Sequence, residues 1–256
     1  LLTIGLSGCR PEEGLPVDPE LPADSERLPV MEEVEVTNAT VYYVTTDRQY
    51  LLPLNLAINA TKEVAKVAME KLLAGPPNAF ATGVIPADTK LLDLYDGNTT
   101  VYVNVTAGIL DVSAGDAQLA LNSIRCTILP LVEGFKLQLL VEGKVLEELA
   151  EGVDISHPRS LPYVNVRPAD QEKAQQNTAS YTPLTDYLEE SQAMDLVPQT
   201  LLYGPPENDA EPISGEALAE DQARALVAAL LENQPEESGL FSPFEQGTEL
   251  VDLRVE

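Results

Sequence analysis

The clearest pattern of apolar and polar positions in the chain predicts a helix that begins near Thr61. Thr61 is a suitable N-cap, and Gly75-Pro76 ends the helix because glycine adopts the left-handed cap geometry and proline breaks the hydrogen-bond ladder. The apolar residues between these signals have the spacing of one helical face. They are Val64, Ala65, Ala68, Met69, Leu72 and Leu73.

A β-hairpin is predicted directly after this helix. Its strands cover residues 91–95 and 100–105, and Asp96-Gly97-Asn98 between them is a strong turn signal. In the second strand, valines alternate with polar residues, which indicates that one face of the sheet is buried.

Further elements surround this helix and hairpin. Residues 40–44 are rich in β-branched and aromatic side chains and predict a strand, and residues 50–53 predict a second strand at a sheet edge because of Pro53. Ser113 can cap a second amphipathic helix, which Pro130 and Gly134 bound. The apolar positions of this helix are Ala117, Ala120, Leu121, Ile124, Ile128 and Leu131.

The remaining elements complete the first unit. Residues 135–141 alternate as a strand, Glu142-Gly143 turns the chain, residues 144–146 can pair back, and residues 152–156 close the unit. The order of elements predicts an α+β fold with two helices packed on one face of a small β-sheet.

Part of this pattern recurs about 160 residues later, which predicts two tandem units rather than a solenoid. Leu72 of the helix end aligns with Leu230, and Thr89 before the first hairpin strand aligns with Thr248. We expect a first domain over 36–160, a linker over 161–195, and an incomplete second domain over 196–256. In the second domain we expect a strand at 200–203, a helix at 220–231 and a strand at 250–255. This layout suggests a piece of a longer protein, cut at both ends.

The N-terminal residues predict a lipid anchor. Leu6-Ser7-Gly8-Cys9 resembles the bacterial lipobox, in which the cysteine thiol is acylated and small residues precede it for the signal peptidase. Residues 1–9 are then a signal remnant, and the acidic, proline-rich residues 10–35 are a disordered tether. The alternative for Cys9 is a buried thiol in an ordinary core strand.

The composition limits the possible partners. The net charge is −27 and the pI is about 4.1, so repulsion from phosphate argues against nucleic acid and against anionic lipid surfaces. The acidity is greatest after residue 173, where 17 acidic residues face only Arg224 and Arg254 as bases. We interpret this charge as a solubility feature rather than a cation site, since no EF-hand loop is present.

Candidate chemistry is sparse in this sequence. A Ser-His-Asp triad would need His157, the only histidine, but no Gly-x-Ser-x-Gly elbow accompanies it. Zinc ligands and phosphate-binding loops are also missing, so we expect no catalytic residues, no metal and no cofactor. Cys126 is interpreted as a buried free thiol that packs as a small hydrophobe.

Two sets of residues match short patterns without adding a function. Paired acids are frequent in an acidic chain, and we interpret them as solvated surface residues: Glu32-Glu33, Glu147-Glu148 and Glu189-Glu190. The Asn-x-Thr triplets would accept glycans only in a eukaryotic secretory route, so we interpret them as turn and strand-edge residues. They begin at Asn38, Asn59, Asn98 and Asn104.

Five motifs follow one another at characteristic spacings. They are Leu72-Leu73-Ala74-Gly75-Pro76-Pro77, Ile85-Pro86 with Thr89-Lys90-Leu91-Leu92, Val101-Tyr102-Val103-Asn104-Val105, Ser123-Ile124 with Thr127-Ile128-Leu129, and Val141-Glu142-Gly143-Lys144. Their order and spacing resemble the GerM domain of sporulation and spore-germination proteins. The closing residues 152–156 fit the same pattern.

The resemblance implies tandem GerM domains, the second one truncated, on a lipoprotein outside the cytoplasmic membrane. It also implies a fold similar to ring-building modules and association with an envelope-spanning complex, and it implies no catalytic residues. We therefore expect a non-enzymatic, lipid-anchored protein that binds envelope or sporulation-complex proteins, with homo-oligomers possible and the lipid as its only membrane contact. The alternatives are a cell-wall hydrolase that uses paired carboxylates, and a lipoprotein that captures a ligand in a deep apolar pocket.

Overall fold

The computed structural model describes residues 36–132, 136–150, 152–176, 182–190, 196–204, 215–232, 240–245 and 247–254. The predicted signal remnant, Cys9, the tether and Glu32-Glu33 lie outside these residues. Among the described helices, none combines the length and the apolarity that crossing a bilayer requires.

The described chain begins with a long antiparallel hairpin. Strand β1 (Val36–Thr45) pairs with β2 (Leu51–Asn59) in one unbroken register, from Val36 opposite Asn59 to Val44 opposite Leu51. Strand β3 (Ala81–Thr82) adds two residues to the other side of β1. The sheet order β2-β1-β3 confirms that β2 is an edge strand, as Pro53 predicted.

A second sheet has the order β4-β5-β6-β7. Strands β4 (Leu91–Gly97) and β5 (Thr100–Val105) form the predicted hairpin, and Asn98 in its turn has a φ of 72°. Strand β6 (Lys136–Val141) lies parallel to β5, and the short β7 (Arg159–Ser160) is antiparallel to β6. Parallel neighbours need a crossover, and a helix supplies it here.

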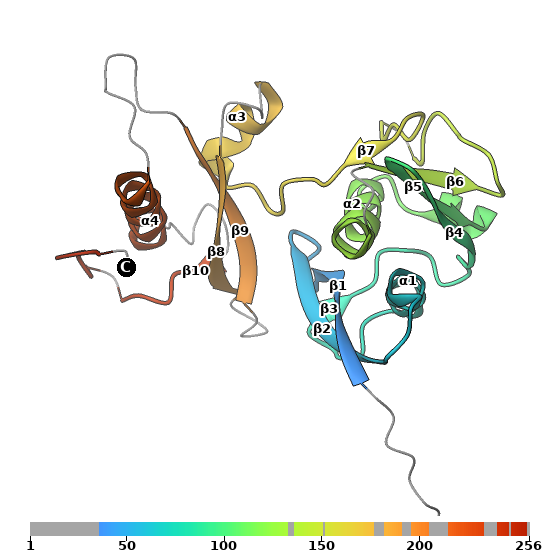
Figure 1. Cartoon of the computed structure of the whole chain (residues 1–256), viewed down its shortest axis with the longest axis horizontal. Coiled ribbons are helices and arrows are strands. Elements are labelled where there is room, and N and C mark those ends of the chain that lie inside the picture. Colours follow the sequence, from blue (N-terminus) through green and yellow to red (C-terminus); the bar gives the residue numbers. More distant parts are fainter. Residues whose placement is uncertain are drawn as a thin grey trace, which may run out of the picture. The chain divides into compact units, whose positions relative to one another are not determined.

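Two helices lie between these sheets, as Figure 1 shows. They are α1 (Val64–Ala74) and α2 (Ala117–Ile128), and α2 connects β5 to β6. Nine of the 12 residues of α2 are buried, more than one amphipathic face would bury. The α+β class is confirmed, and the strands that the sequence assigned to one small sheet are divided between two sheets, so α2 is covered on more than one side.

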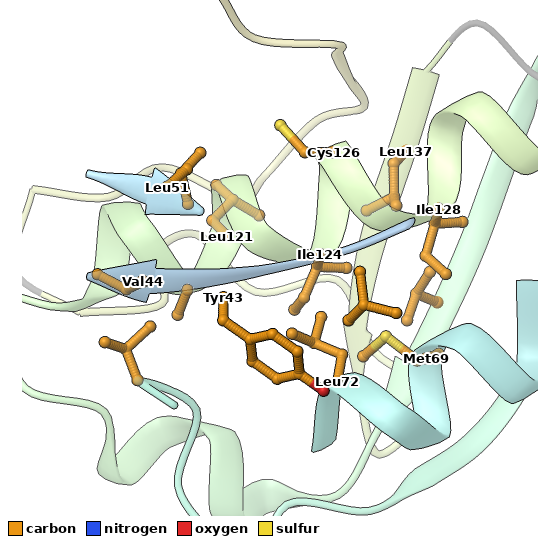
Figure 2. Packing of buried hydrophobic residues seen from close by; sticks show 14 of the residues in the cluster. Tyr43, Val44, Leu51, Met69, Leu72, Leu121, Ile124, Cys126, Ile128 and Leu137 are labelled. Atoms are coloured by element: carbon orange, nitrogen blue, oxygen red, sulfur yellow. The ribbon is translucent and has the colours of Figure 1, made fainter. Parts of the chain in front are cut away.

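The core forms where the helices meet both sheets. Val101, Val103 and Val105 of β5 are fully buried, and their parallel partners on β6 are Leu137, Leu139 and Val141. Figure 2 shows the surrounding cluster, in which Tyr43 and Val44 of β1 lie among side chains of both helices. The helix residues labelled there are Met69, Leu72, Leu121, Ile124, Cys126 and Ile128.

The helix ends differ slightly from the predictions. Helix α1 begins at Val64 rather than next to Thr61, because the Thr61 hydroxyl accepts a hydrogen bond from Glu63 N (3.1 Å) in a local turn. Ser113 Oγ accepts a hydrogen bond from Asp116 N (3.2 Å) directly before α2, which places it close to its predicted capping role.

Short elements and turns connect the larger ones. Glu142 and Gly143 both have positive φ, 50° and 76°, and their turn brings Lys144 back onto Val141. The predicted pairing of 144–146 is thus reduced to one bridge. The 3₁₀ turns are η2 (Ala107–Asp111), η3 (Leu129–Leu131) and η4 (Pro168–Asp170), and η3 contains the predicted helix stop, Pro130.

A third sheet contains the later part of the chain. Its order is β10-β8-β9, formed by β8 (Thr182–Glu190), β9 (Leu196–Tyr203) and β10 (Leu240–Phe241), and α4 (Glu216–Leu231) packs on it. The short α3 (Gln171–Gln176) and β8 lie inside the range expected to be a linker. The domain boundaries themselves remain predictions.

One predicted strand is wrong over its described part. Residues 250–254 do not form a strand, and Val251 is 95% exposed. The aligned residues of the first unit, from Leu91 onward, form β4 by pairing with β5. No described residue offers the same pairing to 250–254, and a strand is stable only when its backbone groups are paired.

The Tyr43 hydroxyl provides a test of this core. Tyr43 is 1% exposed, and its hydroxyl donates to the carbonyl oxygens of Lys71 (2.8 Å) and Gly75 (3.1 Å) at the end of α1. We expect Tyr43→Phe to lower the free energy of unfolding by about 1–2 kcal/mol in urea titrations, because two carbonyl groups at the end of α1 lose the hydroxyl that donates to them. The control is Tyr95→Phe, since Tyr95 is 44% exposed, and an equal loss in both variants would contradict this assignment.

The same side chain predicts a pH dependence. Burial raises the pKa of Tyr43 from 10.0 to about 12. A raised folded-state pKa gives stability that is complete below the unfolded pKa and is lost as the pH rises toward the folded value. Between pH 10 and 12, stability should therefore fall less in Tyr43→Phe than in the unmodified chain, as measured by chemical unfolding at each pH.

Candidate functional site

The only histidine lies in a polar loop at the end of the first unit. Asp154 Oδ1 accepts hydrogen bonds from Ser156 N (2.8 Å) and Ser156 Oγ (2.7 Å), and Arg159 contacts Asp154 Oδ2 at 2.8 Å. His157 Nδ1 lies 3.0 Å from Ser156 Oγ and 3.4 Å from Asp154 Oδ2. The hydrogen bonds from Ser156 are the main cause that lowers the pKa of Asp154, and the charges of His157 and Arg159 add to it.

This loop brings serine, histidine and aspartate together without the geometry of a catalytic triad. In a triad the serine and the aspartate bind opposite nitrogens of the imidazole, so that one nitrogen accepts the serine proton while the other is held. Here the same nitrogen, Nδ1, faces both groups, and the serine hydroxyl donates to the carboxylate. The cluster therefore fits an aspartate-stabilised turn rather than a nucleophilic site.

A buried arginine connects this loop to α2. Arg125 is 9% exposed, and its guanidinium donates to Ser160 O through Nε (2.9 Å) and to Asn122 Oδ1 through Nη1 (2.9 Å). Burial is the main cause that lowers its pKa from 12.5 to about 10, with Cys126 acting in the opposite direction and the charge of Arg159 adding to the lowering. Since the acceptors are a β7 carbonyl and a side chain of the same helix, Arg125 fastens β7 to α2.

Cys126, the next residue, is a buried free thiol, as predicted. It is 1% exposed, and burial raises its pKa from 9.0 to about 12, although the nearby Arg125 charge acts in the opposite direction. Because the thiolate is the reactive form, this thiol is inert in the folded state.

The described part of the molecule contains a cavity between β1, α1 and α2. Tyr43, Leu72, Val84 and Ser123 are among its lining residues, and its volume is ≈ 10 Å³. That volume holds about one water molecule, far less than the several hundred Å³ of a typical small-molecule site. It does not correspond to the deep apolar pocket of the ligand-capture alternative.

Other predicted residues lie at the surface. Glu147 and Glu148 are exposed, and the structure does not describe the side chains of Glu189-Glu190. Asn98 lies in the β4–β5 turn, as interpreted. Asn104 lies on β5, which is paired with β4 and with β6, so the strand-edge interpretation is wrong for this residue, and its Oδ1 accepts a hydrogen bond from Gly143 N (2.7 Å). Among the described residues there is no group of three or more His, Cys, Asp or Glu that could hold a metal ion.

The sheet edges are the remaining candidates for a functional surface, because an unpaired edge is a template for another strand. The β4 edge is protected. It contains a bulge between Leu91 and Asp93, and Asp93 Oδ1 accepts the Leu94 N–H at 2.9 Å. Asp96 also lies on this strand, so two carboxylates and an irregular backbone oppose the addition of a further strand.

The β9 edge is covered by the preceding chain. Thr200 N donates to Asn165 O (3.2 Å), Arg167 N donates to Thr200 O (3.1 Å), and Leu202 N donates to Asp170 Oδ2 (3.1 Å). Asp170 is itself 2% exposed and contacts Lys173 at 2.5 Å. The other edge strands, β3, β7 and β10, have two residues each.

The outer edge of β2 is protected only at its beginning. The Asn165 side chain accepts from Leu51 N (2.8 Å) and donates to Leu51 O (2.8 Å), so the backbone groups of Leu51 point away from β1. Because the β1–β2 register is regular, Pro53, Asn55, Ala57 and Asn59 have the same outward orientation.

The open part of this edge is uncharged. Asn55, Ala57 and Asn59 are exposed, and no described residue pairs with their outward backbone groups. Neither β1 nor β2 contains a charged residue, although 22% of the chain is charged. Pro53 predicted an edge strand here but no binding role, and the uncharged run over β1 and β2 was the signal that could have indicated one.

Comparison with known proteins relates this structure to a family. Residues 40–147 match the family model Germane, described as sporulation and spore germination. This part of the chain is similar to the GerM-like family. The matched range runs from β1 to the turn after β6 and includes the open β2 edge, whereas Ser156 and His157 lie beyond it.

A solved structure shares the fold of this chain. The tandem GerMN domains of the sporulation protein GerM from Bacillus subtilis align with a TM-score of 0.63 and 21% identity, covering 87% of this chain and 76% of that chain. The first GerMN domain of the same protein aligns at 22% identity with a TM-score of 0.44, covering 48% of this chain and 97% of that one. No curated protein matches.

The buried thiol of this chain gives a direct test of the core. In a Cys9→Ala variant, we expect a thiol reagent such as DTNB to modify no cysteine in the native protein at pH 8 and to modify Cys126 after denaturation, because burial keeps this thiol protonated. The measurement is the absorbance of the released thiolate. Rapid modification of native Cys126 would contradict the buried position.

Proposed function

We propose that this chain is a lipid-anchored, extracytoplasmic protein that works by binding other proteins of the cell envelope during sporulation or spore germination. The observation that carries the proposal is the match of residues 40–147 to a family described by those two processes. The open β2 edge lies inside the matched range and supports a binding role, because a free edge can accept a strand from a partner.

The anchoring part of the proposal rests on the sequence. Leu6-Ser7-Gly8-Cys9 has the lipobox pattern, and the acidic, proline-rich residues 10–35 follow it as a spacer. Two observations support contact rather than turnover as the mode of action. In the histidine loop, Ser156 and Asp154 face the same imidazole nitrogen, and the described cavity beside Tyr43 has a volume of only ≈ 10 Å³.

Metabolic labelling tests the anchor. A bacterial host that expresses the full reading frame should incorporate a fatty-acid label into the protein, and Cys9→Ala should abolish the label and release the protein from the membrane fraction. Cys126→Ala is the matched control. This variant should keep the fatty-acid label and the membrane association, because the Cys126 thiol is buried and is not the predicted lipidation site. Equal labelling of wild type and Cys9→Ala would exclude lipidation at this residue.

Crosslinking in intact cells tests the binding role. A photoreactive amino acid at Ala57, on the open β2 edge, should capture specific envelope proteins in sporulating cells. The control position is Asp96 on the protected β4 edge, which should capture few. Equal capture from both positions, or none from either, would count against binding through β2.

A further inference from the structure

The open β2 edge has a sequence that reads nearly the same in both directions. Residues 55–59 are Asn-Leu-Ala-Ile-Asn, and Ala57 is their centre. An antiparallel partner strand runs in the opposite direction, so such a segment can pair with a second copy of itself across a two-fold axis. We propose that two copies of this chain associate through β2 in the register that places Ala57 opposite Ala57 of the second copy. This inference deepens the proposed binding role and rests on it.

Backbone geometry selects this register. Asn55, Ala57 and Asn59 direct their N–H and C=O groups outward, so only registers that oppose these residues form hydrogen bonds. Pro53 has the same orientation and has no N–H to donate. The register centred on Ala57 pairs Asn55 with Asn59 of the second copy. Among the registers whose paired segment excludes Pro53, it pairs the most residues.

The side chains also suit a second copy. Asn55, Ala57 and Asn59 lie on one exposed face, where each asparagine would face an asparagine and the small alanine would lie on the axis. On the opposite face, Ile58 is buried and Leu56 is half-buried. Leu56 of one copy would lie opposite Ile58 of the other copy. Apolar neighbours across an antiparallel pair stabilise a sheet.

The charge distribution favours a second copy of this chain, rather than a basic partner, as the occupant of the β2 edge. Two chains of net charge −27 repel each other, so they can meet most readily where neither strand has a charge. Strands β1 and β2 have none. A basic segment would gain nothing from this neutral edge, and the acidic β4 edge, with Asp93 and Asp96, would attract it more strongly.

The pairing covers few residues, so it is weak in dilute solution. An interface of this size lies below the area that a stable dimer needs. Proteins confined to one membrane surface have a higher effective concentration, and a weak two-fold contact then becomes significant. The proposed lipid anchor would supply this confinement.

Register-specific disulfides test the proposal. The experiment uses the full 256-residue chain with Cys9→Ser, while the buried Cys126 is kept. In the proposed register, the Cα atoms of Ala57 and its symmetry mate are about 5.5 Å apart, which a disulfide can span. Under mild oxidation at high protein concentration, Ala57→Cys should therefore form a covalent dimer.

A single Asn55→Cys variant is the matched control. Its Cα atoms would be about 14 Å apart in the proposed register, beyond the reach of a disulfide, so this variant should remain monomeric. The double variant Asn55→Cys with Asn59→Cys should crosslink again, because these residues face each other. Equal crosslinking of Asn55→Cys and Ala57→Cys, or no dimer from Ala57→Cys, would overturn the proposal.

Sedimentation equilibrium gives an independent measurement. Ala57→Pro removes an outward N–H from each strand but leaves the β1–β2 hydrogen bonds intact, and it should weaken self-association at least about tenfold. Ala57→Val keeps the N–H and should retain self-association, and unfolding curves check that both variants fold. Strictly monomeric wild type at every accessible concentration would overturn the inference.

These results separate the inference from the proposed function. If wild type is monomeric but the photoreactive amino acid at Ala57 captures other envelope proteins, the edge binds a different partner, and self-pairing is wrong while the binding role stands. If the covalent dimer forms in the predicted register but no envelope protein is captured in cells, self-pairing stands and the wider binding role is contradicted.

Discussion

The first unit depends on burying helix α2 on more than one side. The helix connects β5 to β6 and lies between two sheets, so its polar residues also need partners inside the protein. Thr127 Oγ1 accepts the backbone N–H of Tyr42 at 2.9 Å, and Arg125 donates to the β7 carbonyl of Ser160. A buried polar group without a partner costs more than a hydrogen bond gains, so these contacts fix how α2 meets β1 and β7.

The burial of α2 also explains which features could be predicted from the sequence. Local signals were sufficient for the β4–β5 hairpin, the edge position of β2 and the apolar faces of both helices, since each depends on neighbouring residues. The second covered side of α2 could not be predicted, because the partners of Thr127 and Arg125 are distant in the sequence. The division into two sheets follows from the same long-range contacts, which have no local signature.

In the later part of the chain, predictions made from local sequence patterns alone were wrong. Residues 248–253 resemble the start of β4, yet residues 250–254 form no strand, since strand formation depends on pairing as well as on side-chain alternation. Conversely, residues 161–195 were predicted to be a polar linker but include β8, in which Leu188 is fully buried and lies opposite Val197 of β9. In the candidate site, the sequence showed only that His157 directly follows Ser156, and the structure was needed to show that Ser156 and Asp154 both face Nδ1 of the imidazole.

Charge and edge protection together show how this acidic chain can combine solubility with selective contact. Its edges are closed in different ways: by a bulge and Asp93 on β4, by the 165–170 segment on β9, and by Asn165 at the first residue of β2. A protein that only needed solubility would gain from a charge at Ala57, because an inward or edge charge is the simplest defence against strand addition. The absence of any charge along β1 and β2, in a chain with 42 acidic residues, agrees with the contact proposed for this edge.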